Sequence, residues 1–240
     1  MRYLQEKVLI IIPCYNEEQR LNFQPFQLAP SNFFFLFVND GSTDGTSALI
    51  RPRCSSNIHL YDLSQNQGKA EAVRQGFIQA KSLPFYHELD WVGYWDADLA
   101  TPLSEIQQFL RYQEYFAPTA QAIFGSRIKR LGSRIIRNAR RHFLGRLFAT
   151  VVSNMFGLES YDTQCGAKLF RKELVDTISH EAFISKWAFD VEIILRLKGI
   201  EIVEYPLSYW EDVKGSKLNV AKTALRILGD LRKIRKQYKS

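Results

Sequence analysis

Short apolar runs alternate with longer helix-type segments along the first hundred residues of the chain. Four runs of five or six largely apolar residues are rich in β-branched and aromatic side chains, and polar turn residues follow each of them. These runs predict buried strands at 7–12, 33–38, 57–61 and 91–95. The clearest helical segment between them covers 68–83. The alternation predicts an α/β fold with a doubly wound, mostly parallel sheet and helices on both of its faces.

Polar and acidic residues follow three of the predicted strands. They form the segments PCYNEE (13–18), NDGSTDGT (39–46) and DADLATP (96–102). Ligands of parallel sheets bind at the carboxyl ends of the strands, so we expect these residues to surround a binding site. Asn, Asp and Gly are also ordinary turn formers, so turns alone are the alternative. Thr101 and Pro102 predict the N-cap and first position of a helix, which leaves the two aspartates without a capping role.

Beyond residue 125 the hydrophobic pattern changes to two basic amphipathic segments. Apolar residues recur at three- and four-residue intervals over 133–157, and a second such stripe runs through 216–240. Four arginines crowd the first half of the earlier segment: Arg134, Arg137, Arg140 and Arg141. Both segments predict amphipathic helices. Since no linker or repeat separates them from the rest, we expect one domain at 1–212 with a basic helical extension at 213–240.

The net charge of +7 is distributed unevenly along the 240 residues. Residues 127–146 carry eight basic and no acidic residues, and 214–239 carry nine basic residues and one acidic residue. The remainder carries 15 basic and 24 acidic residues. Two basic segments are thus attached to an acidic body, and we expect each to meet an anionic partner. A nucleic acid is one alternative, but the acidic strand ends would repel it.

The sequence contains no apolar stretch long enough to span a bilayer. The nearest candidate, 143–158, is short and contains Arg146 and Asn154. The first apolar run ends at Pro13, which makes it too brief for a signal peptide. The three cysteines are widely spaced and contain no CxxC, so we expect reduced thiols. Together these features predict a cytoplasmic location.

The candidate chemistry is that of carboxylates and not of a glycine-rich phosphate loop. No GxGxxG follows the first strand and no GxxxxGK[ST] occurs, so neither a dinucleotide dehydrogenase nor a P-loop enzyme is supported. A phosphate ligand would then need a divalent cation held by carboxylates. Mg²⁺ and Mn²⁺ suit that role because they prefer a few hard oxygen ligands together with the phosphates of the substrate.

Seven motifs along the chain resemble those of family 2 glycosyltransferases, which have the GT-A fold. They are PCYNEE, VNDGSTDGT, NQGKAEAVRQG, DADLATP, DTQCGAKLF, KWAFDVEIILRLKG and EYPLSYWEDVKGSKL, in the family's order and spacing over about residues 7–220. The last two are similar to the polyprenyl-phosphate branch, most of all to dolichyl-phosphate β-glucosyltransferases and next to dolichyl-phosphate mannose synthases. The resemblance implies an inverting, metal-dependent hexosyltransferase from a nucleotide sugar to a polyprenyl or dolichyl phosphate. UDP-glucose is the favoured donor and GDP-mannose is the alternative donor. A saccharide hydroxyl is the alternative to a lipid phosphate as acceptor.

The resemblance assigns the donor site to residues at the strand ends. The matching nucleotide-binding positions are Pro13, Tyr15, Asn16, Glu17, Asp40, Gly68, Lys69 and Asp96. Asp96 and Asp98 match the family's metal-binding pair, in which the metal stabilises charge on the leaving nucleoside diphosphate, and Asp98 is also a candidate catalytic residue. Lys69 could instead be an ordinary residue of a first helical turn. Ala100 stands where the mannose synthases carry a metal-contacting glutamine, which the glucosyltransferase branch also lacks.

The resemblance also supplies candidate residues for the acceptor. The positions that match the acceptor-phosphate site are Arg127, Arg134, Arg137, Ser216 and Lys217. A guanidinium fork suits a phosphate monoester, although a solvated surface is the alternative for any one arginine. Asp190 matches the catalytic base of relatives with hydroxyl acceptors. A phosphate monoester is largely dianionic at neutral pH, so we expect Asp190 to orient the acceptor or a cation; an exposed helix carboxylate beside Glu192 is the alternative.

The two basic amphipathic segments predict attachment to the cytoplasmic face of a membrane. Each Lys or Arg near an anionic bilayer contributes roughly 1 kcal/mol, and the apolar stripe adds burial in the interface. Many relatives have transmembrane helices at one end. Since this sequence predicts no such helix, we expect the chain to bind as a peripheral protein. It would use its own helices, a membrane-protein partner or a second copy of itself.

Overall fold

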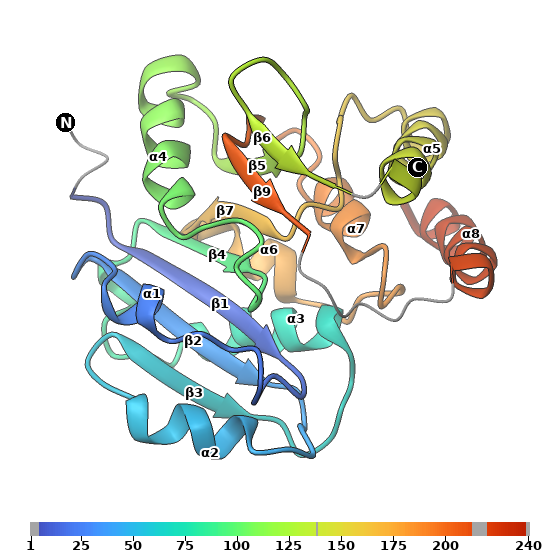
Figure 1. The fold of residues 1–240 in the computed structure, drawn as a ribbon. Coiled ribbons are helices and arrows are strands. Elements are labelled where there is room, and N and C mark those ends of the chain that lie inside the picture. Colours follow the sequence, from blue (N-terminus) through green and yellow to red (C-terminus); the bar gives the residue numbers. More distant parts are fainter. Residues whose placement is uncertain (1–4, 138, 213–219, 239–240) are drawn as a thin grey trace.

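Seven strands form the central sheet of the protein, which a computed structural model describes over residues 5–137, 139–212 and 220–238 (Figure 1). Their order across the sheet is β3-β2-β1-β4-β7-β5-β8. The strands are β1 (Val8–Cys14), β2 (Phe33–Asn39), β3 (Ile58–Asp62), β4 (Trp91–Trp95), β5 (Ala122–Ser126), β7 (Ala167–Arg171) and β8 (Ile202–Pro206). Neighbouring strands are parallel except at β7, which runs antiparallel to β4 and β5. All four predicted strands are present, which confirms the predicted α/β class and the mostly parallel sheet.

Helices cover both faces of this sheet (Figure 1). The α-helices are α1 (Gln24–Gln27), α2 (Thr46–Ile50), α3 (Lys69–Ala80), α4 (Glu105–Phe116), α5 (Ala139–Phe156), α6 (Val175–Ser179), α7 (Phe189–Arg196) and α8 (Val220–Tyr238). The short 3-10 helices are η2 (Arg51–Arg53), η3 (Tyr86–Glu88) and η4 (Lys172–Leu174). Phe26 of α1 and Phe109 of α4 belong to one core. Phe77 of α3, Ile178 of α6 and Phe189 of α7 belong to the core on the other face, so the doubly wound arrangement is confirmed.

Strand β1 shows why the predicted strands are continuous runs of apolar residues. Val8, Ile10 and Ile12 point into one core, whereas Leu9 and Ile11 point into the other. All five side chains are fully buried. A parallel strand with helices on both faces has no position for a polar side chain. The first polar groups therefore follow the end of the strand, at the carboxyl edge of the sheet.

The start of α4 differs from the prediction. The helix begins at Glu105 and has Ser104 as its N-cap residue, so the prediction that Thr101 and Pro102 begin it was wrong. The carbonyl of Thr101 instead accepts a hydrogen bond from the indole N–H of Trp95 at 2.7 Å. The carbonyl of Pro102 accepts one from the backbone N–H of Glu105 at 3.0 Å. A buried indole needs an acceptor, and supplying it holds residue 101 in a turn ahead of the helix.

The first basic segment also differs, because it is not one continuous helix. Arg134–Ile136 forms strand β6, which pairs in parallel with β9 (Tyr209–Glu211), and α5 begins only at Ala139. The predicted helix over 133–157 was therefore wrong at residues 134–136. Within β6 only Ile135 is buried, as expected for a strand with alternating sides. The partner strand lies far away in the sequence, so helical periodicity alone could not reveal the pairing.

Helix α8 packs beside α5 and against α7 (Figure 1). Leu231 and Ile234 of α8 are fully buried in a cluster with Val152 of α5 and Val191 of α7. The predicted boundary at residue 212 adjoins 213–219, which lie outside the described residues. Within the part of the chain that the structure describes, no helix is both long and apolar enough to cross a membrane.

Candidate active site

The carboxyl ends of β1, β2 and β4 meet around a cavity of about 290 Å³. The residues that line it are Pro13, Cys14, Tyr15, Glu17, Asp40, Lys69, Ala72, Asp96, Ala97 and Asp98. Six of the eight predicted nucleotide-binding residues are among them, together with both predicted metal ligands. The parallel sheet thus brings the three strand-end segments together, as their positions in the sequence predicted. Asn16 and Gly68 are outside this lining and shape the loops around it.

The loop after β1 is held to the loop after β2 by side-chain to backbone hydrogen bonds. Asn16, which has a φ of 53°, donates its backbone N–H to the Ser42 hydroxyl at 3.0 Å. Its side-chain oxygen accepts the backbone N–H of Thr43 at 2.9 Å. Asn tolerates the left-handed conformation better than most residues. Asn16 therefore fixes the geometry of the two loops and does not itself line the cavity.

Glu17 brings a carboxylate from the first loop into the cavity. Its Oε1 pairs with Arg20 at 2.6 Å. Its Oε2 is buried and has no hydrogen-bond partner among the described residues. Burial raises the pKa of Glu17, Arg20 opposes the increase, and the negative charges of Asp98 and Asp44 add to it. An unpaired oxygen on a carboxylate with a raised pKa marks a place where a cation or a donor would be stabilising.

Asp40 organises the turn that leads into α3. Its two carboxylate oxygens accept the backbone N–H groups of Gln67 and Gly68, each at 2.8 Å. Burial raises the pKa of Asp40, and these two hydrogen bonds oppose the increase. Gly68 has a φ of 96°, which a residue with a side chain rarely adopts. The structure therefore places Asp40 at the cavity wall and gives Gly68 a conformational role in the turn.

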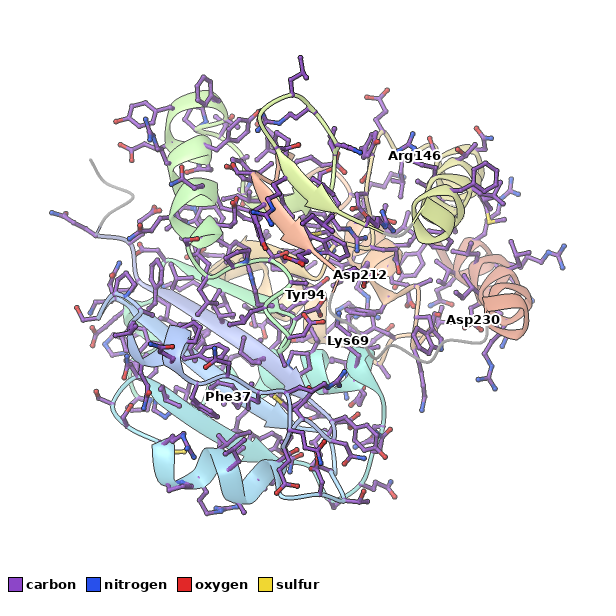
Figure 2. All side chains as sticks on the ribbon, in the orientation of Figure 1. Phe37, Lys69, Tyr94, Arg146, Asp212 and Asp230 are labelled. Carbon is purple, nitrogen blue, oxygen red and sulfur yellow. The ribbon has the colours of Figure 1, made fainter. Side chains whose placement is uncertain are left out.

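Lys69 is the first residue of α3 (Figure 2) and forms an ion pair with Asp96, which also lines the cavity. Burial by itself would lower the pKa of Lys69, but the negative charges of Asp96, Asp190 and Asp98 outweigh this effect and raise the pKa. The ammonium group therefore remains charged at neutral pH. Its pairing with Asp96 argues against the alternative that Lys69 is only a residue of a first helical turn.

Asp96 and Asp98 lie on one tight loop after β4. The backbone N–H of Asp96 donates to the carbonyl of Gly166 at 3.0 Å, and Asp98 Oδ1 accepts the N–H of Ala100 at 3.1 Å. Leu99, which directly follows Asp98, has a φ of 50°, an uncommon conformation for a branched residue. Desolvation raises the pKa of Asp98, and the neighbouring charge of Asp96 raises it further. A divalent cation would relieve this crowding of negative charge.

The site offers few side chains that could bind a metal ion. Among the residues that the structure describes, no three His, Cys, Asp or Glu side chains are grouped to hold a metal ion. Ala100 is buried and offers no ligating side chain. Mg²⁺ is commonly bound by one or two carboxylates, with substrate phosphates completing its shell. Asp96 and Asp98 fit a metal that arrives with a diphosphate.

The predicted acceptor arginines differ in their surroundings. Arg127 directly follows β5 at the same edge of the sheet as the donor cavity, because β4 and β5 both run antiparallel to β7. Arg127 forms a two-pronged ion pair with Asp162 at 2.6 and 2.8 Å and lies over the ring of Trp210. Arg134, on β6, is exposed and lies over the ring of Tyr209. Neither residue is helical. The predicted residues Ser216 and Lys217 lie outside the described residues.

Arg137 is half-buried and close to Arg127. Burial lowers the pKa of Arg137 and the positive charge of Arg127 lowers it further, while the negative charges of Asp162 and Asp212 oppose the decrease. Gly145 of α5 lies directly beneath the guanidinium, since a Cβ there would be 2.7 Å from Arg137 Nη2. Arg127 is itself paired with Asp162. The binding of an acceptor phosphate by Arg137 stays a prediction.

Asp190 is buried at the start of α7, which rules out the alternative of an exposed helix carboxylate. Its Oδ1 accepts hydrogen bonds from Lys168 Nζ at 2.6 Å and from the hydroxyl of Tyr94. Figure 2 shows Tyr94 toward the middle of the molecule. Asp190 thus has a cation, Lys168, as its partner. Its role toward the acceptor stays a prediction.

Sequence reasoning did not single out three residues that shape the site. Lys168 is fully buried, Asp162 pairs with Arg127, and Gly166 lies against Asp96. All three belong to the quoted motif DTQCGAKLF, which contains a lysine inside an otherwise apolar strand. A lysine is almost never fully buried unless it is paired. A lysine inside an apolar strand was therefore the feature of the sequence that could have pointed to these residues.

The comparison with protein families agrees with the fold and the site. Residues 9–179 match the family described as Glycosyl transferase family 2. The match covers more than half of the chain, so the chain belongs to this family and is a glycosyltransferase. The resemblance inferred from the seven motifs is thereby confirmed.

Sequence identity to curated relatives indicates which branch of the family this chain resembles. A dolichyl-phosphate beta-glucosyltransferase of Dictyostelium discoideum is 30% identical over 95% of this chain and 74% of its own length. One of Saccharomyces cerevisiae is 31% identical over 95% of this chain and 74% of its own length. The chain is thus similar to dolichyl-phosphate beta-glucosyltransferases over almost its whole length, as the last two motifs predicted.

Solved structures confirm the fold. Glucosyl-3-phosphoglycerate synthase from Mycobacterium tuberculosis, in complex with Mn²⁺, uridine diphosphate and phosphoglyceric acid, has a TM-score of 0.69. The alignment covers 96% of this chain and 78% of that chain at 15% identity. At this identity the similarity shows a shared GT-A-like fold.

Proposed function

We propose that this protein transfers glucose from UDP-glucose to dolichyl phosphate, or to another polyprenyl phosphate, at a membrane surface. The observation that carries the proposal is the cavity at three strand ends, where Lys69 faces Asp96 beside Asp98. A cation and a carboxylate pair in one cavity suit a sugar diphosphate with a metal ion. The names of the relatives at 30% and 31% identity support glucose as the sugar and dolichyl phosphate as the acceptor.

The donor would lie along the cavity from the β1 loop to the β4 loop. Pro13, Tyr15 and Asp40 would hold the uridine, since Asp40 offers acceptor oxygens to ring N–H groups. Lys69 would neutralise one phosphate of the diphosphate. Its ammonium group now pairs with Asp96, so donor binding would require it to share that pairing with the phosphate.

Mg²⁺ or Mn²⁺ would be held by Asp96 and Asp98. When bound, such an ion stabilises the negative charge that develops on the leaving nucleoside diphosphate. The unpaired Glu17 Oε2 and the raised pKa of Asp98 are the features of this chain that support a cation here. The solved relative with Mn²⁺ and uridine diphosphate supports the same choice.

The acceptor phosphate would bind on the Arg137 side of the site. A phosphate monoester has its second pKa near 6 and is largely a dianion at neutral pH, so it attacks without a general base. Asp190 is bonded to Lys168 and Tyr94 and is poorly placed to remove a proton. This observation favours a phosphate acceptor over a hydroxyl acceptor. The charge of Arg137 would orient the phosphate oxygen toward the anomeric carbon.

Direct attack by the phosphate implies inversion at the anomeric carbon. The chain then needs no enzyme nucleophile, and an α-linked sugar nucleotide gives a β-linked lipid phosphate. The coupling constant of the anomeric proton in the NMR spectrum of the product measures the configuration. A product that retains the α configuration would contradict direct attack.

Attachment to the membrane surface would involve α5 and α8. Phe143 and Leu147 of α5 are 70% and 54% exposed, and Leu228 of α8 is 39% exposed. The exposed cations of α8 include Arg232, Arg235 and Lys236, so apolar and basic groups share this side of the molecule. Apolar side chains among cations suit the interface of an anionic bilayer. The proposal places the extension at 213–240 in this role.

The deciding experiment measures sugar transfer from radiolabelled UDP-glucose to dolichyl phosphate in vesicles, with Mn²⁺ or Mg²⁺. We expect label in the lipid fraction, no label without the metal, and no transfer from GDP-mannose. Transfer from GDP-mannose alone would overturn the assignment of glucose. Label on a soluble saccharide but not on the lipid would overturn the lipid acceptor.

A thermal-shift measurement separates donor binding from transfer. A ligand that binds only the folded protein raises its melting temperature. We expect UDP and UDP-glucose with Mn²⁺ to raise it, and GDP and GDP-mannose to leave it unchanged. Stabilisation by GDP alone would contradict the proposed donor.

A further inference from the structure

Lys168 lies in the centre of the sheet and has no part in the proposed transfer. It belongs to β7, where it pairs with Tyr94 of β4 on one side and with Phe124 of β5 on the other. The side chain is fully buried, and its ammonium nitrogen lies 5.5 Å and 5.0 Å from the ring centroids of these two residues. Burying a charge is costly unless it is paired and hydrogen-bonded. The position therefore requires an explanation in terms of what the ammonium group holds.

The ammonium group of Lys168 makes three hydrogen bonds. It donates to the carbonyl of Thr163 at 3.0 Å, to the carbonyl of Cys165 at 2.6 Å and to Asp190 Oδ1 at 2.6 Å. A lysine ammonium has three N–H donors, so every donor is used. Asp190 balances the charge, and the two carbonyls belong to the loop that precedes β7. Lys168 thus ties this loop to the start of α7.

The tied loop ends at Gly166, which touches Asp96 of the donor site. The backbone N–H of Asp96 donates to the Gly166 carbonyl at 3.0 Å. A Cβ at position 166 would lie only 2.0 Å from Asp96 Oδ2, so the glycine backbone is in close contact with the carboxylate. A shift of the loop would therefore move the Asp96 carboxylate or release it. Asp96 in turn pairs with Lys69 in the cavity.

The other end of the loop is fixed independently. Asp162 pairs with Arg127, and its backbone N–H donates to Glu204 Oε1 at 3.1 Å. Within the stretch between Asp162 and Gly166, Asp162 Oδ1 also accepts the N–H of Gln164 at 3.3 Å, and Lys168 holds the carbonyls of Thr163 and Cys165. The lysine thus acts on the part of the loop that contacts the donor site.

We propose that Lys168 is a positioning residue for glycosyl transfer, which holds the loop 163–166 against Asp96 and thereby sets the carboxylate that faces the donor diphosphate. It touches neither substrate nor the cavity and acts through Gly166. The inference rests on the proposed donor site. A lysine that only filled the core would have no effect on Asp96 once the fold is intact.

The first test removes the hydrogen bonds of Lys168 to the loop without leaving an unpaired buried charge. The double variant Lys168→Met, Asp190→Asn replaces both charges, whereas Lys168→Met alone would strand the Asp190 carboxylate. We expect the affinity for UDP with Mn²⁺ to fall about tenfold or more, as is typical when a partner of a metal ligand is lost. The affinity for UDP without metal should change less than about twofold, because the uridine end contacts other loops. Isothermal titration calorimetry measures both.

A second readout does not depend on sugar transfer or on nucleotide binding. Hydrogen exchange of the Asp96 amide reports the hydrogen bond to Gly166, and we expect at least about tenfold faster exchange in the double variant. Tyr94→Phe is the matched control because it removes the other donor to Asp190 and leaves both loop carbonyls bonded to Lys168. Its Asp96 amide should exchange at the rate of the unchanged chain. Equal acceleration in Tyr94→Phe would mean that general loosening of the core is responsible, and would overturn the proposal.

Gly166→Ala tests the same link from its other end, should the double variant fail to fold. Gly166 does not have a positive φ, so the added methyl group conflicts only with its surroundings, and with Asp96 first. We expect the same selective loss of affinity for UDP with Mn²⁺. If that affinity stays unchanged in Gly166→Ala, the loop does not set Asp96 and the proposal fails. If the unchanged chain neither binds UDP nor transfers glucose, the proposed function fails instead, while Asp96 exchange still decides whether Lys168 positions this loop.

Discussion

The proposed donor side and the proposed acceptor side of this enzyme are built in different ways. On the donor side, Asp96 and Asp98 directly follow a buried strand and face an open cavity. On the acceptor side, Arg127 is paired with Asp162, 35 residues further along the chain. Arg134 lies over Tyr209, a residue from the opposite strand of a small separate sheet. The parallel sheet assembles the first group by its topology, whereas each arginine depends on a partner distant in the sequence.

This difference shows where a charged residue in a motif is available to a ligand. The carboxylates just beyond the ends of β2 and β4 line an open cavity because these strands end at the edge of the sheet, although Asp96 also pairs with Lys69 there. An arginine in a basic segment can be neutralised by a carboxylate brought in by the fold. Arg127 has such a partner in Asp162, whereas Arg137 is half-buried near the charge of Arg127 and near those of Asp162 and Asp212. The predictions below test that contrast, from the largest expected effect to the smallest.

Replacing Asp98 with Asn tests the donor side and should have the largest effect. The change removes a negative charge from the carboxylate pair, and we expect the initial rate of glucose transfer to fall roughly a thousandfold, or about 4 kcal/mol. Asp62→Asn is the matched control, since Asp62 also ends a strand but pairs with Arg51 outside the cavity. Equal losses in both variants would contradict the assignment of the donor site.

Asp162→Asn tests whether Arg127 is mainly a structural partner. The variant leaves the buried guanidinium without its counter-ion, and we expect the free energy of unfolding to fall by about 3 kcal/mol. Urea denaturation at neutral pH measures the change. Asp176→Asn breaks an exposed pair with Lys81 and should cost less than about 1 kcal/mol. A small effect at both positions would show that Arg127 does not need Asp162.

The pH dependence of the stability of Asp162→Asn tests whether the pairing of Asp162 with Arg127 is favourable. Burial by itself would raise the pKa of Asp162, but Arg127 outweighs it and lowers the pKa from 3.8 to about 2. A lowered pKa in the folded state contributes stability above the unfolded pKa, and this contribution disappears as pH falls through the folded pKa. The stability difference between the chain and Asp162→Asn should therefore be full above about pH 4 and shrink toward pH 2. A difference that grows as the pH falls would contradict the pairing.

Arg137→Gln tests the acceptor side directly. We expect the KM for dolichyl phosphate to rise about tenfold, with the KM for UDP-glucose changing less than about twofold, because one charged contact to phosphate is lost. Arg134→Gln is the control, since its guanidinium lies over Tyr209 on an exposed strand. Gly145→Ala should resemble Arg137→Gln, since its methyl group would displace the Arg137 guanidinium. A larger effect from Arg134→Gln would reverse the assignment of the two arginines.

Phe143→Ser with Leu147→Ser tests the proposed membrane surface. Both side chains are exposed on α5, and losing them should lower the fraction that floats with anionic liposomes about fivefold or more. Phe116→Ser is the matched control, because Phe116 is 76% exposed at the end of α4. Unchanged flotation of the double variant would count against attachment through α5.

Asp230→Ala should have the smallest effect and tests how α8 is joined to the rest of the enzyme. Asp230 lies on α8 (Figure 2) and accepts a hydrogen bond at 2.9 Å from the buried hydroxyl of Ser185. Its loss should cost about 1 kcal/mol, measured by urea denaturation. Lys233→Ala removes an exposed neighbour on the same helix and should have no measurable effect. Equal stability of all three proteins would mean that the hydrogen bond contributes nothing.

Much of the donor site could be predicted because strand patterns and strand-end chemistry are local in the sequence. The runs that became β1 and β4 have no polar positions, and Asp96 and Asp98 follow the second of them at once. Asn16 and Gly68 lie in the loops around the cavity and do not line it, and their binding of nucleotide stays a prediction. That distinction depends on hydrogen bonds to Ser42, Thr43 and Asp40, which no local pattern specifies.

The sequence by itself determined the class of fold, the edge of the sheet that holds the site and the family. It could do so because hydrophobic periodicity and strand-end residues follow from the backbone geometry of single elements. The tertiary structure alone decided that Arg134 is in a strand, that Arg127 belongs to Asp162 and that Lys168 lies buried beneath the site. These outcomes depend on pairing and burial between segments far apart in the chain, where the cost of an unpaired buried charge selects the partner.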